Sequence, residues 1–207
     1  MKVYFVRHGE SEYNVAERHQ HAAVPLSANG KQQAEIVAER FTKIPVDTII
    51  SSNYLRALDT AKTIGAKIGK TVEVISLFRE RKRPNEIEGL SIKSNKAGQV
   101  IEQILENWHN HDWHYSNEEN FLDLKNRAQE IIDYLEARTE NEILVVTHGG
   151  ILRVVVLLIL LGDQLNSHTF QASFEVLEMA NTGITICEKK AGRPWRVLCW
   201  SDFAHLG

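Results

Sequence analysis

The chain has 207 residues, of which 43% are apolar and 25% are charged, and its formal net charge is −3. This composition is typical of a folded globular protein and excludes a mostly disordered chain. The nearly balanced charge provides no general basic surface for nucleic acid and no acidic block of the kind that forms a disordered tail.

Two further features bear on the protein's surroundings. Cys187 and Cys199 are too few for a disulfide framework, and we expect reduced thiols. The longest apolar run, residues 154–161, is far shorter than the roughly twenty residues that a membrane span needs. Residues 1–6 hold one lysine and too short an apolar stretch for a secretory signal. We therefore expect a cytoplasmic protein without a membrane or nucleic-acid partner.

The first part of the chain alternates predicted strands with predicted helices. Residues 2–6 are predicted to form a strand. Ser27 is a candidate N-cap for a helix whose apolar side chains then recur at helical spacing up to residue 41. A strand at 46–52 leads into a helix that should stop near Gly69, and residues 72–76 follow as a third strand.

The second part begins with a polar stretch that we expect to be irregular, from about residue 79 to residue 119. An amphipathic pattern predicts a helix over 121–138. Residues 142–150 include an almost continuous apolar run, which is typical of a central parallel strand, and a buried helix should follow to about Leu161. Residues 183–188 and 195–200 are predicted to form a closing edge hairpin.

This alternation predicts an α/β fold, a three-layer sandwich with a mostly parallel sheet and helices on both faces. We expect a single domain, residues 1–207, with an insertion at about 79–119 that covers the mouth of the active site. Ligands bind outside the carboxyl ends of the strands in such sheets. The candidate site is therefore made by three sequences at strand ends: VRHGES, ISSNYLR and VVTHGG.

Each of these strand ends carries a cationic or imidazole side chain. Arg7 and His8 follow the first strand, Arg56 lies about one turn into the helix after the second, and His148 with Gly149 follows the fourth. Guanidinium groups bind phosphate oxygens in pairs, and a glycine-rich helix N-terminus adds backbone donors for an anion. An imidazole can attack phosphorus. Together these groups predict a site for phosphoryl chemistry.

Five segments in chain order resemble the histidine phosphatase superfamily, which is also called phosphoglycerate mutase-like. They are RHGES with Asn14, then PLSANGKQQA, SSNYLRALDTA, the region of Glu80, and VTHGGILR. One RHG triplet would be a weak signal, whereas five segments with the family's order and spacing are specific. The resemblance implies the phosphoglycerate mutase-like fold of branch 1, and an enzyme that uses no cofactor or metal and takes a small phosphorylated molecule as substrate.

The resemblance also implies a role for each matching residue. His8 corresponds to the nucleophile that becomes phosphorylated. Arg7, Arg56 and His148 correspond to the phosphate pocket, and Asn14 corresponds to an additional phosphate contact. A nucleophilic imidazole must be neutral at the attacking nitrogen, and the two arginines lower its pKa. We expect a backbone carbonyl of the Gly9 turn to fix its tautomer.

The proton donor to the leaving oxygen has more than one candidate. Glu80 aligns with the family's donor. The sequence after it, RKRPNEIEG, lacks the family's aromatic residue and glycine, contains Pro84 and is about one residue longer. Glu86 and Glu88 therefore remain alternatives for the acid.

A further segment, EENFLDLKNR, resembles the family sequence that begins the long helix. Asn120 stands where the family usually has serine, and Glu118 stands where it has glycine. We interpret this segment as structural, with Arg127 as an ion-pair partner and not a substrate group.

Residues 79–83 contain four basic side chains beside the candidate acid: Arg79, Arg81, Lys82 and Arg83. They are either a solvated loop or a basic collar that attracts a second anionic group of the substrate.

Several histidines near the expected mouth receive no catalytic role. Residues 107–115 are rich in histidine and tryptophan, but the stretch lacks the further ligands that a metal site needs. We expect Trp108 and Trp113 to pack the insertion onto the body of the protein. His19 and His21 are interpreted as bystanders.

Three functions are compatible with these residues. The first is a phosphatase that hydrolyses a small phosphomonoester through phosphorylated His8. A mutase would use the same phosphohistidine and return the phosphate to the substrate, but family mutases tend to have a larger closing insertion than residues 79–119. A weakly catalytic phospho-ligand-binding module is the third, and the intact set of arginines and histidines argues against it. The sequence does not indicate an oligomeric state.

Overall fold

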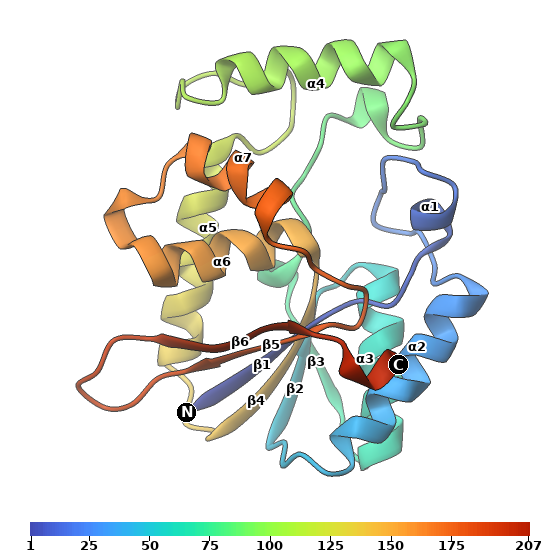
Figure 1. Ribbon diagram of the computed structural model, residues 1–207, viewed down its shortest axis with the longest axis vertical. Helices are drawn as coiled ribbons and strands as arrows, with labels where there is room; N and C mark the ends of the chain where they lie inside the picture. Colours follow the sequence, from blue (N-terminus) through green and yellow to red (C-terminus); the bar gives the residue numbers. More distant parts are fainter.

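The computed structural model describes residues 1–207. The protein is built around one six-stranded sheet (Figure 1). The strand order is β3-β2-β4-β1-β5-β6. The strands are β1 (Lys2–Arg7), β2 (Thr48–Ser51), β3 (Val72–Val74), β4 (Glu142–Thr147), β5 (Ile184–Glu188) and β6 (Arg196–Asp202). Strands β3, β2, β4 and β1 run parallel, whereas β5 is antiparallel to both β1 and β6. The mostly parallel sheet and the closing edge hairpin are thereby confirmed.

Helices cover both faces of the sheet, which confirms the three-layer α/β architecture (Figure 1). The α-helices are α1 (Glu12–Val15), α2 (Ala28–Phe41), α3 (Leu55–Ile68), α4 (Asn95–Asn107), α5 (Phe121–Glu136), α6 (Gly149–Leu161) and α7 (Ser167–Val176). Short 3₁₀ turns lie at Ser76–Phe78, Asn85–Ile87, Gly162–Gln164 and Ala204–Leu206.

The alternation of side chains along β1 shows how the two halves of the core are divided. Val3 and Phe5 pack in the larger apolar cluster with helices α5 and α6, whereas Tyr4 and Val6 pack in the smaller cluster with α2 and α3. Successive side chains of a strand point to opposite faces, so a central strand that is covered on both sides must be apolar at every position. This explains the uninterrupted apolar run that precedes the first polar strand end.

The start of α2 is held directly against the loop that follows β1. The Ser27 hydroxyl accepts a hydrogen bond from the Gly30 amide at 2.9 Å, as the N-cap prediction requires, and donates to the Glu10 carboxylate at 2.6 Å. A Cβ added to Gly9 would lie 2.5 Å from the carbonyl oxygen of Gly30. A Cβ added to Gly30 would lie 1.8 Å from the carbonyl oxygen of Glu10. Only glycine permits this backbone approach, which fixes the loop after His8 against the helix.

The segment 79–119 is more ordered than the sequence predicted. Ser94 caps α4, because its hydroxyl accepts a hydrogen bond from the backbone amide of Ala97. The buried face of this helix contains Ala97, Val100 and Ile104. The expectation of an irregular stretch was therefore wrong for this part. The signal was present, because Ala97, Val100, Ile101, Ile104 and Leu105 recur at helical spacing in this segment.

Two tryptophans join this segment to the body of the protein, as expected. Trp108, at the end of α4, is only 3% exposed, and its ring lies near Phe121 of α5 and Phe170 of α7, with centroid distances of 6.4 and 5.4 Å. Trp113 is partly buried against the same cluster. Helix α7 itself was not predicted. Asn166 caps it, and Phe170 is its main core contact.

Helix α6 is the most apolar helix, and it packs beside α5 on the larger core. It has 13 residues, and the chain contains no helix with the length and apolar character needed to cross a membrane. Arg153 is the one charged residue within it.

Candidate active site

The predicted strand ends converge on one cavity of about 400 Å³. Six of the seven predicted site residues line it: Arg7, His8, Asn14, Arg56, Glu80 and Gly149. The seventh, His148, lies directly beside His8, with 5.1 Å between the ring centroids. Segments that are far apart in sequence meet here because β1, β2 and β4 are adjacent and parallel, so their carboxyl ends share one edge of the sheet.

The geometry around His8 defines which nitrogen carries its proton. Nδ1 lies 2.7 Å from the carbonyl oxygen of Gly9, an acceptor, so Nδ1 must donate. Nε2 accepts a hydrogen bond from Nε of Arg56 at 3.1 Å. Nε2 therefore holds the lone pair, as a nucleophile requires, and the carbonyl of the Gly9 turn fixes the tautomer as predicted.

His8 is also held in its neutral form. Burial lowers the pKa of its imidazole well below the usual value, and the charges of Arg56 and Arg7 lower it further, while the Gly9 carbonyl opposes the shift. The sequence analysis anticipated the contribution of the arginines. Burial, with His8 only 2% exposed, is the larger cause.

His148 occupies the N-cap position of α6 and is completely buried. Its Nε2 lies 2.8 Å from the hydroxyl oxygen of Ser52, whereas its Nδ1 has no hydrogen-bond partner in the protein. Burial lowers the pKa of this imidazole well below its usual value, with further contributions from Arg56 and Arg7. An unpaired buried nitrogen beside His8 is suited to contact a ligand oxygen.

The two arginines of the predicted pocket are held by backbone carbonyls and not by carboxylates. Arg7 Nη1 donates to the carbonyl of Met179, and its buried Nε has no partner. Arg56 Nη1 donates to the carbonyl of His21 at 3.0 Å. Burial lowers the pKa of Arg56 to about 10, so it stays charged at neutral pH. Both guanidinium groups thus keep positive charge available for an anion.

Glu80 lines the same cavity. Its carboxylate accepts hydrogen bonds from the backbone amides of Arg81, Gly150 and Ile151, at 2.8, 3.0 and 3.1 Å. A Cβ on Gly150 would lie 2.6 Å from Oε1 of Glu80, so this position must be glycine for the carboxylate to fit. The first amides of α6 therefore bind Glu80, and of the glycine pair only Gly149 keeps a backbone donor for a phosphate.

The carboxyl group of Glu80 is ionised in the substrate-free protein. Burial raises its pKa, but the amides of Gly150 and Arg81 and the charge of Arg56 outweigh burial, so that the pKa is lowered overall. The two alternative acids lie elsewhere. Glu86 is exposed and accepts a hydrogen bond from the Ser116 hydroxyl, and neither it nor the exposed Glu88 lines the cavity.

Asn14 lies on α1 and completes the capping box of that short helix. Its Oδ1 accepts hydrogen bonds from the amide and the hydroxyl of Ser11, at 3.0 and 2.9 Å. The oxygen is thus directed at the cap, which leaves the amide NH₂ for the cavity that Asn14 lines.

The cavity wall contains several residues to which the sequence gave no role in the site. They are Tyr13, Glu17, Arg18, His19, Gln20, Ile92, Arg153, Phe174 and Met179. His19, which was expected near the mouth, lines the cavity; it is 8% exposed and its Nε2 has no partner. Burial, together with Arg83 and Arg81, lowers its pKa to about 4. The signal for Arg153 was present, since it is a lone charge in an apolar helix, four residues after Gly149.

The four basic residues after β3 separate into two groups. Arg81 and Arg83 line the cavity, whereas Arg79 forms an ion pair with Glu119 at 2.9 Å and Lys82 is outside the lining. The guanidinium carbon of Arg81 lies 4.9 Å from the ring centroid of Trp108. Two of the four basic residues, Arg81 and Arg83, therefore lie where the predicted basic collar requires them.

The histidines at 107–115 do not form a metal site. No group of three or more histidine, cysteine or acidic side chains is arranged to hold a metal ion. His114 instead lies 2.7 Å from a carboxylate oxygen of Asp123, at the start of α5.

The sheet with helices on both faces, and a cavity lined by arginine and histidine at its carboxyl edge, define an enzyme of the phosphoryl-transfer class. A family model of the histidine phosphatase superfamily, branch 1, matches residues 3–202. The chain belongs to this superfamily, as the five sequence segments implied.

Similar proteins cover nearly the whole chain. A phosphoglycerate mutase-like protein 4 from Arabidopsis thaliana is 28% identical over 211 residues, covering 99% of this chain and 86% of the relative. A metal-independent phosphoserine phosphatase from the same plant is 29% identical over 213 residues, covering 99% and 83%. A solved structure of an Entamoeba histolytica phosphoserine phosphatase mutant in complex with phosphoserine is 25% identical, with a TM-score of 0.79, and covers 99% of this chain and 98% of that chain.

Proposed function

We propose that the protein hydrolyses small phosphomonoesters through a covalent phosphohistidine on His8. The observation that carries this proposal is the position of a neutral imidazole, with its Nε2 lone pair facing Arg56, in the same cavity as the Glu80 carboxylate. A nucleophile, fixed cations and a proton carrier around one space are what an in-line displacement at phosphorus requires.

In the first step, Nε2 of His8 attacks phosphorus, and a P–N bond forms as the bond to the leaving oxygen breaks. Arg7, Arg56 and His148 stabilise the phosphoryl oxygens, and Asn14 adds an amide donor. Glu80 gives a proton to the leaving oxygen. Because Glu80 is ionised in the empty site, the proton arrives with the substrate, whose phosphate has a second pKa of about 6. The approaching negative charge also raises the pKa of the carboxyl group.

In the second step, water attacks the phosphorus of phosphohistidine, and the P–N bond breaks. Glu80, again ionised, accepts the proton that this water loses. His8 Nε2 recovers its lone pair and inorganic phosphate leaves. The three backbone amides that bind the Glu80 carboxylate favour its ionised form, and therefore favour its role as a base in this step.

The excess of positive charge in the cavity indicates a substrate with a second anionic group. Six arginines line the cavity: Arg7, Arg18, Arg56, Arg81, Arg83 and Arg153. None of them forms an ion pair, because the arginine ion pairs of this protein all involve other residues. Of the two carboxylates in the lining, Glu17 is paired with Lys93. Glu80 and one phosphate dianion together would leave some of these cations without a counter-charge, and at least Arg56 and Arg153 are buried, where an unpaired charge is costly.

Arg81 and Arg83 are the residues that we assign to this second group. They lie one and three residues after Glu80 and line the same cavity as His8 and Arg56. The phosphoserine bound to the Entamoeba enzyme has a carboxylate in addition to its phosphate. A small phosphomonoester with a carboxylate or a second phosphate fits both the charge and the volume of the cavity.

The substitution Arg83→Gln tests this assignment. We expect KM for a carboxylate-bearing phosphomonoester such as phosphoserine to rise about 10- to 100-fold, the effect of losing one charged hydrogen bond. KM for a phosphate ester of a neutral alcohol should change little. The control is Lys82→Gln, because Lys82 belongs to the same run of basic residues but does not line this cavity. An equal rise for both substrate types would contradict the assignment.

The test of the function itself is the fate of the phosphate. With a panel of phosphomonoesters that includes phosphoserine and 3-phosphoglycerate, we expect inorganic phosphate to be released in amounts equal to the free alcohol. Phosphate migration within 3-phosphoglycerate, followed by NMR, would instead establish the mutase alternative. The absence of turnover with every ester, together with tight binding, would favour a phospho-ligand-binding module.

A further inference from the structure

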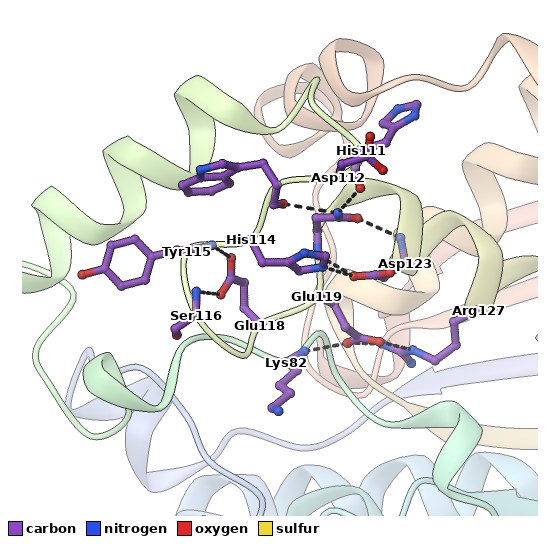
Figure 2. A network of polar contacts seen from close by, with 12 residues as sticks. Lys82, His111, Asp112, His114, Tyr115, Ser116, Glu118, Glu119, Asp123 and Arg127 are labelled. Atoms are coloured by element: carbon purple, nitrogen blue, oxygen red, sulfur yellow. Dashed lines mark hydrogen bonds and ion pairs between the residues drawn. The ribbon is translucent and has the colours of Figure 1, made fainter.

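The segment that carries Glu80 is held by one buried ion pair, between Glu119 and Arg127 (Figure 2). The pair is bidentate: Nε and Nη2 of Arg127 donate to the two carboxylate oxygens of Glu119 at 2.7 and 2.8 Å. Both residues are nearly buried, at 9% and 5% exposure. Charged hydrogen bonds of this paired type are strong and fix both distance and orientation.

Glu119 extends this pair to the residues on both sides of Glu80. Its Oε1 also accepts a hydrogen bond from Nη2 of Arg79 at 2.9 Å, and its Oε2 accepts one from the backbone amide of Lys82 at 2.8 Å. The backbone amide of Glu119 donates in turn to the carbonyl of Lys82 at 3.2 Å. The contact between Lys82 and Glu119 is visible in Figure 2.

Arg127 binds the same segment from its other end. Its Nη1 donates to the carbonyls of Leu77 and Arg79, at 3.0 and 2.7 Å. The carbonyl between them, that of Phe78, accepts from the hydroxyl of Thr147 at 2.8 Å. Backbone groups at 77, 78, 79 and 82 are therefore all bound, whereas the side chain of residue 80 projects into the cavity.

The position of the ion pair is set by the start of α5. Asn120 caps this helix through a capping box with Asp123, and its amide also donates to the carbonyl of His111 at 2.7 Å. Glu119 precedes the cap, and Arg127 lies two helical turns after it. A rigid helix start thus holds both members of the pair.

We infer that Glu119 and Arg127 are positioning residues for Glu80: they hold the segment 77–82 so that the Glu80 carboxylate stays in the cavity that His8 lines. This inference rests on the proposed function, in which Glu80 protonates the leaving group. It assigns a role in turnover to a pair that lines no part of the cavity. Proton transfer requires the donor within about 3 Å of the leaving oxygen, so a small displacement of this segment weakens it.

The substitution Glu119→Gln tests the inference, because it removes the negative charge of the carboxylate and retains the shape of the side chain. We expect kcat/KM for alkyl phosphates, which have poor leaving groups, to fall about 10- to 100-fold more than kcat/KM for p-nitrophenyl phosphate, within the range of general acid catalysis. In a Glu80→Gln background the same substitution should have little further effect on alkyl phosphates, because the group that it positions is already absent.

Glu118→Gln is the matched control. Glu118 is a neighbouring buried carboxylate that accepts hydrogen bonds from the amides of Tyr115 and Ser116 and forms no hydrogen bond or ion pair with residues 77–82 (Figure 2). The Glu118→Gln variant should show the same dependence of rate on the leaving group as the wild type. An equal loss with both leaving groups in Glu119→Gln, or a loss that adds fully to that of Glu80→Gln, would overturn the inference.

A second readout does not depend on catalysis. The amides of Arg81 and Gly150 donate to Glu80 and not to Glu119. Glu119→Gln should speed their hydrogen exchange in the substrate-free protein, and Glu118→Gln should not. Faster exchange in a protein that hydrolyses no ester would contradict the proposed function alone, whereas unchanged exchange would contradict the positioning role. If the single variant unfolds, Glu119→Gln combined with Arg127→Met leaves no unpaired buried charge and permits the same measurements.

Discussion

Replacing His8 with alanine is expected to abolish turnover of every phosphomonoester, with kcat reduced by roughly 10⁴-fold or more, as in enzymes that lose a covalent nucleophile. We expect no other group in the cavity to replace it, because only His8 has its Nε2 lone pair fixed beside Nε of Arg56 by the Gly9 carbonyl. The measurement is phosphate release from p-nitrophenyl phosphate and from phosphoserine. Acid-labile phosphoprotein should be trapped in a rapid quench of the wild type and be absent from the variant.

The variant should remain folded, which makes the loss interpretable. His8→Ala removes one ring and leaves Nε of Arg56 without its acceptor, so we expect a moderate fall in melting temperature and an unchanged circular dichroism spectrum. His109→Ala, at an exposed histidine outside the cavity, is the matched control and should behave as the wild type. Turnover of His8→Ala near the wild-type rate would exclude His8 as the nucleophile.

Glu80→Gln should produce a loss that depends on the leaving group. Alkyl phosphates need a proton on the departing oxygen, and their kcat/KM should fall by about 10²- to 10⁴-fold, the usual contribution of a general acid. The aryl oxide that leaves from p-nitrophenyl phosphate is a stable anion, so kcat/KM for this ester should be affected far less. The measurement is a plot of log kcat/KM, which reports the first step and not the second step in which Glu80 is the base, against the pKa of the leaving alcohol. The plot should be steeper for the variant.

The two alternative acids provide the comparison. Glu86→Gln and Glu88→Gln change exposed side chains outside the cavity and should leave this slope as it is in the wild type. An equal loss for alkyl and aryl phosphates in Glu80→Gln would remove Glu80 as the proton donor. A steeper slope in either of the other two variants would transfer the role to that residue.

The residues at strand ends could be placed from the sequence because their positions follow from topology alone. Arg7, His8 and His148 come directly after apolar strands, and Arg56 lies within one turn of such an end. Parallel strands bring their carboxyl ends to one edge whatever the details of packing, so these residues had to meet. The tautomer of His8 was predictable for the same reason, because its acceptor is the adjacent backbone.

Other parts of the site depend on contacts between distant segments, and a local pattern does not record those contacts. Arg18 and His19 reach the cavity because the loop after α1 is held by backbone bonds to residues 89 and 90, for example from the amide of His19 to the carbonyl of Leu90. Helix α4, in contrast, has an apolar period in the sequence, and only the surface that it covers required the fold. Arg127 was expected to form an ion pair, but its partner and its contacts with the segment of Glu80 became visible only with the fold.

The contacts of Trp108 link helix α4 to Arg81, and not to the residues that we propose for bond breaking. One side of its ring packs against the aromatic cluster that anchors α4, and the guanidinium of Arg81 lies over the ring. Substitutions on α4 or in the loop after it can therefore reorient Arg81 without disturbing His8, Arg56 or the sheet edge that carries them. A lineage that retains the catalytic half of the cavity can in this way acquire new substrates by varying a segment that takes no part in bond breaking.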